Sequence, residues 1–151
     1  MTATRAITRR VGPGLPDCAL TFVDREPIDL ARAESQHAAY VDALRRAGAV
    51  VEVLPADATQ PDSVFVEDVA VVLDEVAVVT RPANVLRQRE VPAIAAALSS
   101  HRNLLRLVAP ATLEGGDVLR LGRDLFVGLS SRTNAEGFSR FASIVEAFGY
   151  R

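Results

Sequence analysis

The sequence has no lysine and a single cysteine, Cys18, among its 151 residues. One cysteine excludes an internal disulfide and fits a reducing compartment such as the cytoplasm. The formal net charge is −2 and the arginines form no basic block, so nothing marks a nucleic-acid surface. The polar N-terminal segment lacks a signal-peptide core, and no apolar run approaches membrane-spanning length. We therefore expect a cytoplasmic protein that binds neither nucleic acid nor membrane.

Two segments share one pattern. Residues 67–82 (EDVAVVLDEVAVVTRP) and 116–133 (GDVLRLGRDLFVGLSSRT) each carry an early acid, an apolar strand, a polar turn, a second apolar strand and then arginine. The turns Asp74-Glu75 and Gly122-Arg123-Asp124 favour β-hairpins, and the apolar strands suit burial on both faces. The repeat therefore predicts two equivalent hairpins.

Helices and further strands complete this repeating unit. The periodicity predicts helices over 29–47, 90–98 and from Thr133 to Gly149, the last opened by a capping box in which Thr133 is the N-cap and Glu136 reaches back. Strands are expected at 49–54 and 103–108. The apolar stripes of the first and third helices are Leu30, Ala33, His37, Val41 and Leu44, and Phe138, Phe141, Ala142, Val145 and Phe148.

The order strand–strand–helix–strand predicts an α/β protein built from repeated ββαβ modules. We expect a single incomplete domain with modules at about 1–55, 56–109 and 110–151, the third without its last strand. Either the chain is a fragment or another chain supplies that strand. Open strand edges would favour self-association.

Two loops at equivalent points of the repeat are acidic, at residues 61–68 and 112–117. Any one of these acids is most simply a solvated turn residue. Five acids on equivalent loops instead suggest a pocket for a guanidinium, a planar cation with five N–H donors that pairs with carboxylates. The acids are Asp62, Glu67, Asp68, Glu114 and Asp117.

Arginines follow both acidic hairpins and could bind the carboxylate of an arginine-like ligand. Arg81, Arg87 and Arg89 follow the first hairpin, and Arg132 follows the second. For Arg81 and Arg89 a surface or salt-bridge role is the simpler interpretation.

The motifs PDSVFVED, TRP with an arginine five residues beyond its proline, LEGGD and SSRTNAEG occur in one order along the chain. This ordered set resembles the bacterial dimethylargininases of the pentein superfamily, over the N-terminal part of a typical member. The resemblance implies a five-bladed α/β propeller of ββαβ modules around a central site, with no metal or cofactor. The substrate would be a small molecule, methylated arginine or an arginine analogue.

The resemblance also implies roles for individual residues. Asp62 and Glu67 would hold the guanidino nitrogens, with Asp68 beside them. Arg87 and Arg132 would clamp the substrate carboxylate. Leu20 would lie on a loop that closes over the ligand, and Glu114 would orient the catalytic histidine.

The mechanism implied by the resemblance is nucleophilic. A cysteine thiolate attacks the guanidinium carbon and expels dimethylamine, and histidine-activated water then releases citrulline. The family's catalytic histidine and cysteine lie beyond Arg151, so we expect this chain alone to be inactive. Cys18, His37 and His101 are not expected to replace them, because a lone cysteine and a histidine on an apolar stripe are usually structural.

Alternatives remain open from the residues. Arginine deiminase, agmatine deiminase and amidinotransferase share the implied fold. A non-catalytic module that binds arginine analogues, or an inactive fragment, would retain the same acids and arginines.

Overall fold

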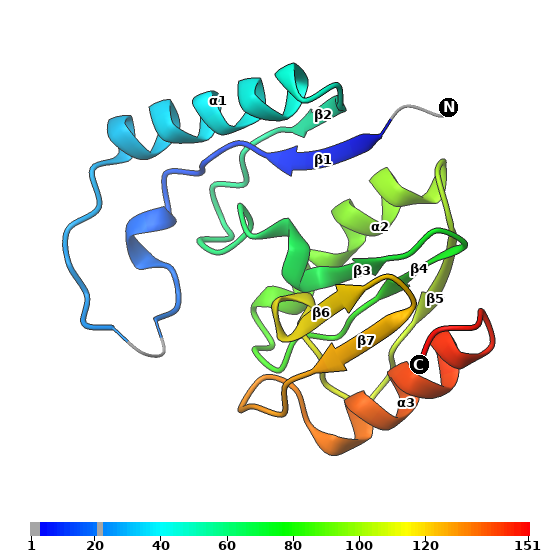
Figure 1. Cartoon of the computed structure of the whole chain (residues 1–151). Coiled ribbons are helices and arrows are strands. Elements are labelled where there is room, and N and C mark those ends of the chain that lie inside the picture. The colour runs from blue at the N-terminus through cyan, green and yellow to red at the C-terminus, as the bar shows by residue number, and fades with distance from the viewer. Residues whose placement is uncertain (1–3, 21–22) are drawn as a thin grey trace. The chain divides into compact units, whose positions relative to one another are not determined.

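A computed structural model describes residues 4–20 and 23–151, which divide into two compact units, Met1–Val66 and Glu67–Arg151 (Figure 1). The first unit contains β1 (Arg5–Arg9), α1 (Leu30–Arg46) and β2 (Val50–Leu54). Strands β1 and β2 pair in parallel, with Arg5 opposite Val50. The unit is thus a β-α-β crossover with a helix between parallel neighbours.

Helix α1 confirms the predicted apolar stripe. Asp29 caps its N-terminus, since the carboxylate accepts a hydrogen bond from the Arg32 amide at 3.0 Å. Gly48 follows the helix with a φ of +89°, a conformation that suits glycine. All helix residues outside the stripe are exposed, whereas the five stripe residues are shielded.

The second unit contains two strand pairs and two helices. Its elements are β3 (Ala70–Val72), β4 (Val76–Val79), α2 (Val91–Ser99), β5 (Asn103–Arg106), β6 (Val118–Leu121), β7 (Asp124–Val127) and α3 (Ala135–Glu146). Strands β3 and β4 form an antiparallel hairpin, and β5 adds in parallel to β4. The order β3-β4-α2-β5 is the predicted ββαβ unit, and β6-β7-α3 repeats its first three elements.

The core of the second unit lies between β4, the loop before Glu114 and α3. Its buried members are Leu73, Val76, Val78, Leu107, Leu113, Phe141, Val145 and Tyr150. Leu113 is fixed by its backbone, because its amide donates to the Arg81 carbonyl at 3.1 Å. The segment that carries Glu114 is therefore anchored directly beside the end of β4.

Three details differ from the sequence prediction. The helix α3 is capped by Asn134, whose side chain accepts from the Gly137 amide at 2.7 Å, rather than by Thr133. The Thr133 hydroxyl instead donates to Asp117, and Glu136 pairs with Arg140. The Thr133 hydroxyl therefore binds a half-buried acid that is distant in the chain and does not form the local capping box.

The other two differences concern exposure and the second turn. Phe138, expected on the apolar stripe of α3, is exposed. All four residues of β4 are buried, but Leu119, Leu121 and Phe126 of β6 and β7 are exposed, so that hairpin is covered on one face. Asp124 belongs to β7 and not to the turn, where Gly122 has a φ of +64°.

The structure establishes a mixed α/β fold with three small sheets among the described residues. Closure into a five-bladed propeller stays a prediction, as does the division into three modules of one domain.

Candidate functional site

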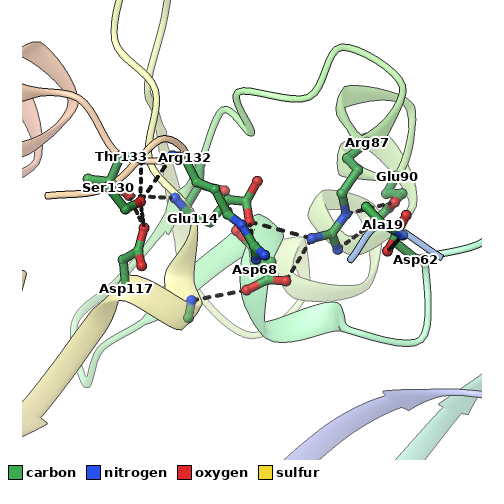
Figure 2. A network of polar contacts seen from close by, with 12 residues as sticks. Ala19, Asp62, Asp68, Arg87, Glu90, Glu114, Asp117, Ser130, Arg132 and Thr133 are labelled. Carbon is green, nitrogen blue, oxygen red and sulfur yellow. Dashed lines mark hydrogen bonds and ion pairs between the residues drawn. The ribbon is translucent and has the colours of Figure 1, made fainter. Parts of the chain in front are cut away.

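A buried ionic network lies at the start of β3 and of α2 (Figure 2). The short 3-10 turn Val66–Val69 presents Asp68, and the turn Arg87–Arg89 presents Arg87. Arg87 Nη1 lies 2.7 Å from Asp68 Oδ2. Arg87 Nε and Nη2 donate to the two carboxylate oxygens of Glu90 at 3.1 and 3.0 Å. This side-on pairing holds the guanidinium plane in one orientation.

The guanidinium of Arg87 is charged under all ordinary conditions. Burial alone lowers the pKa of Arg87, but its hydrogen bonds to Glu90 and Asp68 outweigh this effect and raise the pKa further above its usual range. Arg87 is 5% exposed and Glu90 is 4% exposed. The network therefore holds full charges away from water, which requires close pairing.

Glu114 links Arg87 to a second arginine. Glu114 Oε2 lies 3.6 Å from Arg87 Nη1 and 3.3 Å from Arg132 Nη1. Burial raises the pKa of Glu114, and the nearby Asp68 raises it too, against the opposing effect of both arginines. Counted as ionised, the carboxylates of Asp68, Glu90 and Glu114 and the guanidinium groups of Arg87 and Arg132 sum to a formal charge of −1 for these five side chains.

Two glycines of the LEGGD motif let the acidic loops approach each other. A Cβ on Gly115 would lie 2.1 Å from the Glu67 carbonyl oxygen, and one on Gly116 would lie 2.6 Å from Asp68 Oδ1. The Gly116 amide donates to that same oxygen at 3.1 Å. Gly115 therefore requires the absence of a side chain, because the clash is with backbone, whereas a Cβ on Gly116 would displace the Asp68 carboxylate that the Gly116 amide helps to orient.

The loop that carries Arg132 is tied back to the LEGGD motif. Asp117 Oδ2 accepts hydrogen bonds from the hydroxyls of Ser130, at 2.8 Å, and Thr133, at 2.6 Å. The Thr133 hydroxyl oxygen in turn accepts from the Glu114 amide at 3.2 Å. The loop thus holds Arg132 next to Glu114, with 37% of the Arg132 side chain exposed.

Three predicted residues remain: Asp62 and Leu20 in the first unit and Glu67 in the second. In the first unit, Asp62 is buried and accepts a hydrogen bond from the Ala19 amide at 2.9 Å. Ala19 directly precedes Leu20, which is exposed. In the second unit, Glu67 is exposed, although partial desolvation raises its pKa. The structure thus brings together Asp68, Arg87, Glu114 and Arg132, while the ligand roles of all seven predicted residues stay predictions.

The cysteine and histidines have structural surroundings. Cys18 is 4% exposed and packs with Val11 and Leu15. His37 lies on the stripe of α1, where burial lowers its pKa, and the His101 amide bonds the Leu98 carbonyl at the end of α2. Cys18 thus lies in an apolar cluster, whereas His37 is only half-buried, and the structural roles expected for both stay predictions.

Sequence reasoning missed Glu90 and the supporting roles of Ser130 and Thr133. The spacing of Glu90 three residues after Arg87 was a usable signal, because such positions face each other on a helical turn. The roles of Ser130 and Thr133 depend on Asp117, which is distant in the chain, and no local pattern points to them.

Two features are absent from the part of the chain that the structure describes. Residues 4–20 and 23–151 hold no group of three or more His, Cys, Asp or Glu side chains arranged to bind a metal ion. Within those same ranges, every helix is too short or too polar to cross a bilayer.

Comparisons with known proteins identify the family. The profile of the family described as "N,N dimethylarginine dimethylhydrolase, eukaryotic" matches residues 22–151. The N(G),N(G)-dimethylarginine dimethylaminohydrolase of Streptomyces coelicolor is 40% identical over 153 aligned positions, which cover 100% of this chain and 59% of that protein. The chain belongs to the dimethylarginine dimethylaminohydrolase family.

Solved structures agree with this membership. The dimethylarginine dimethylaminohydrolase from Pseudomonas aeruginosa, as a Cys-to-Ser mutant complexed with citrulline, superposes with a TM-score of 0.94 and 34% identity. That match covers 99% of this chain and 59% of the other. The chain thus spans about three-fifths of the length of the family members it matches, and it is related to enzymes that modify arginine.

Proposed function

We propose that this chain forms part of the substrate site of a hydrolase that converts dimethylarginine to citrulline and dimethylamine. The supporting observation is the ionic network that includes Asp68, Arg87, Glu90, Glu114 and Arg132, in which three carboxylates meet two arginines and only Arg132 is substantially exposed. A site with excess negative charge favours a cationic guanidinium over a neutral product. This charge imbalance would help both substrate binding and release of citrulline.

In this proposal the two ends of the substrate meet different groups. Asp62 and Glu67 bind the guanidino nitrogens, with Asp68 beside them, because carboxylates match the fork of N–H donors. Arg132 and Arg87 bind the α-carboxylate, with Leu20 over the ligand. Arg132 is the more accessible of the two arginines, since 37% of its side chain is exposed against 6% for Arg87.

The proposed chemistry has two steps. A cysteine thiolate attacks the guanidinium carbon, and the bond to the dimethylamino nitrogen breaks as that nitrogen takes a proton from the protonated histidine, which gives dimethylamine and a thiouronium intermediate. Water activated by histidine then adds to the same carbon, and citrulline and the free thiol are released. Glu114 orients that histidine, and we propose that the thiolate and the histidine come from a part of the enzyme outside these 151 residues.

The citrulline complex of the Pseudomonas aeruginosa relative supports the choice of product. The products also separate the alternatives. Dimethylamine and citrulline from dimethylarginine indicate the proposed hydrolase. Ammonia and citrulline from arginine indicate a deiminase, and ornithine indicates amidino transfer.

The alternative from another functional class is a module that binds arginine analogues without turnover. The 151-residue chain should be titrated calorimetrically with dimethylarginine and, in parallel, incubated with it for citrulline analysis. Binding without citrulline supports the module, or a requirement for the remainder of the enzyme. Failure to bind dimethylarginine, arginine and citrulline alike would overturn the proposed site.

Arg132→Ala tests the assignment of the carboxylate end. Loss of a buried charge partner costs about 2–5 kcal/mol of binding free energy. We expect a loss in this range for arginine and a much smaller loss for agmatine, which has no carboxylate. Equal losses for both ligands would remove Arg132 from the clamp.

A further inference from the structure

The Arg87 guanidinium has two differently occupied edges. Its Nε and Nη2 atoms bind both oxygens of Glu90 at 3.1 and 3.0 Å. Its Nη1 atom, on the other side, faces Asp68 Oδ2 at 2.7 Å and Glu114 Oε2 at 3.6 Å. Glu90 thus contacts the arginine from the side away from the two acids.

Glu90 is itself held rigidly. It immediately precedes α2, three residues after Arg87, and its side chain is 3% exposed. The backbone between the two residues is a 3-10 turn, closed by the Glu90 amide donating to the Arg87 carbonyl at 2.9 Å. A buried carboxylate on such a turn leaves its partner little freedom to rotate.

We infer that Glu90 is a positioning residue, which aims Arg87 at Asp68 and Glu114 and so sets the geometry with which Arg87 meets the substrate carboxylate. The consequence of this role for substrate binding rests on the proposed function. The orientation of Arg87 itself is a property of the chain without ligand. Glu90 is assigned no contact with the substrate.

Two variants separate positioning from simple charge balance. Glu90→Asp keeps the negative charge but shortens the side chain, so the two-point contact with Nε and Nη2 is lost. Glu90→Gln keeps the length but removes the charge. Glu136→Asp is the matched control, because Glu136 binds Arg140 Nε at 2.6 Å on the exposed face of α3.

The first measurement needs no ligand. Exchange of the Arg87 Nε–H with solvent, followed by ¹⁵N nuclear magnetic resonance, should speed up by about tenfold or more in Glu90→Asp, because a buried hydrogen bond protects that proton. Glu136→Asp should leave Arg87 unchanged. Unaltered exchange of the Arg87 Nε–H in Glu90→Asp would overturn the inference, whether or not the chain binds arginine.

The second measurement compares arginine with agmatine by calorimetry in the same chain. Mispositioning of Arg87 should weaken arginine by about tenfold or more while changing agmatine much less, because agmatine has no carboxylate. Equal weakening of both would mean that Glu90 only maintains the fold, and wild-type affinity in Glu90→Asp would mean that it acts only as a counter-charge. If the wild-type chain binds neither ligand, the proposed function fails, and the exchange measurement alone decides the role of Glu90.

Discussion

Removing the cation at the centre of the ionic network should strongly destabilise the second unit. In Arg87→Met the side chain keeps much of its apolar volume but no longer binds Glu90 and Asp68, which are 4% and 8% exposed. Breaking a buried ion pair by removing one partner costs about 3–5 kcal/mol of unfolding free energy. Since domains are stable by only about 5–15 kcal/mol, the variant should lie close to its unfolding threshold.

A surface pair provides the reference for this magnitude. Arg140 binds Glu136 one helical turn away on α3, and both side chains are more than 40% exposed. Such exposed i,i+4 pairs contribute about 0.3–0.5 kcal/mol. Arg140→Met should therefore cost far less than Arg87→Met, although both remove an arginine from an ion pair in the same unit.

The assay must report on the second unit alone. The chain has two tyrosines and no tryptophan, with Tyr40 on α1 and Tyr150 in the core of the second unit. Urea unfolding in a Tyr40→Phe background, followed by tyrosine fluorescence, would thus monitor Tyr150. A loss below about 1 kcal/mol for Arg87→Met at neutral pH, or a loss equal to that of Arg140→Met, would refute the reasoning.

Three further outcomes are expected. Burial raises the pKa of Glu114, so the folded state holds the carboxyl proton of Glu114 more tightly than the unfolded state does. The free energy of unfolding should therefore fall as the pH rises from about 4.3, the usual pKa of a glutamate, through the raised pKa of Glu114 in the folded state. Urea titrations at several pH values should show a smaller fall in Glu114→Gln. Gly115→Ala would push a Cβ against the Glu67 carbonyl, so calorimetry should show weakened arginine binding and urea a loss of about 1–3 kcal/mol. Tyr150→Phe removes the 2.9 Å hydrogen bond to Glu75 Oε2 and should cost about 1 kcal/mol in urea unfolding followed by circular dichroism, because this variant lacks the fluorescent tyrosine of the second unit; no loss would mean that the bond contributes nothing.

The repeating elements could be predicted because their signals are local. Strands β3 and β4 are apolar runs around the turn Asp74-Glu75, and the α1 stripe has helical spacing. The repeat also predicted that the acidic loops that carry Asp68 and Glu114 occupy equivalent points. The N-cap of α3 could not be predicted in the same way, because the Thr133 hydroxyl is bound by Asp117, sixteen residues away.

The ion-pair partners of the charged side chains could not be predicted from the sequence. Arg87 and Arg132 were expected to await a ligand carboxylate, yet the chain's own acids already bind both of them. Sequence order shows that acids and arginines are near one another along the chain, but pairing is decided at distances of 3 to 4 Å. A ligand carboxylate must therefore compete with, or add to, contacts that exist before it arrives.

The two arginine–glutamate pairs of the second unit show where this limit lies. Arg87 precedes Glu90 by three residues and Arg140 follows Glu136 by four, so local spacing rates both as ordinary helical pairs. The two pairs differ because residues distant in the sequence, Asp68 and Glu114, lie against Arg87. Only glycine at position 115 allows the loop of Glu114 to approach the Glu67 carbonyl so closely. The Arg87–Glu90 pair is buried and orients the arginine, whereas the Arg140–Glu136 pair stays solvated. The role of a charged side chain in this protein therefore depends on the residues that pack against it in the fold, and not on the sequence motif in which it lies.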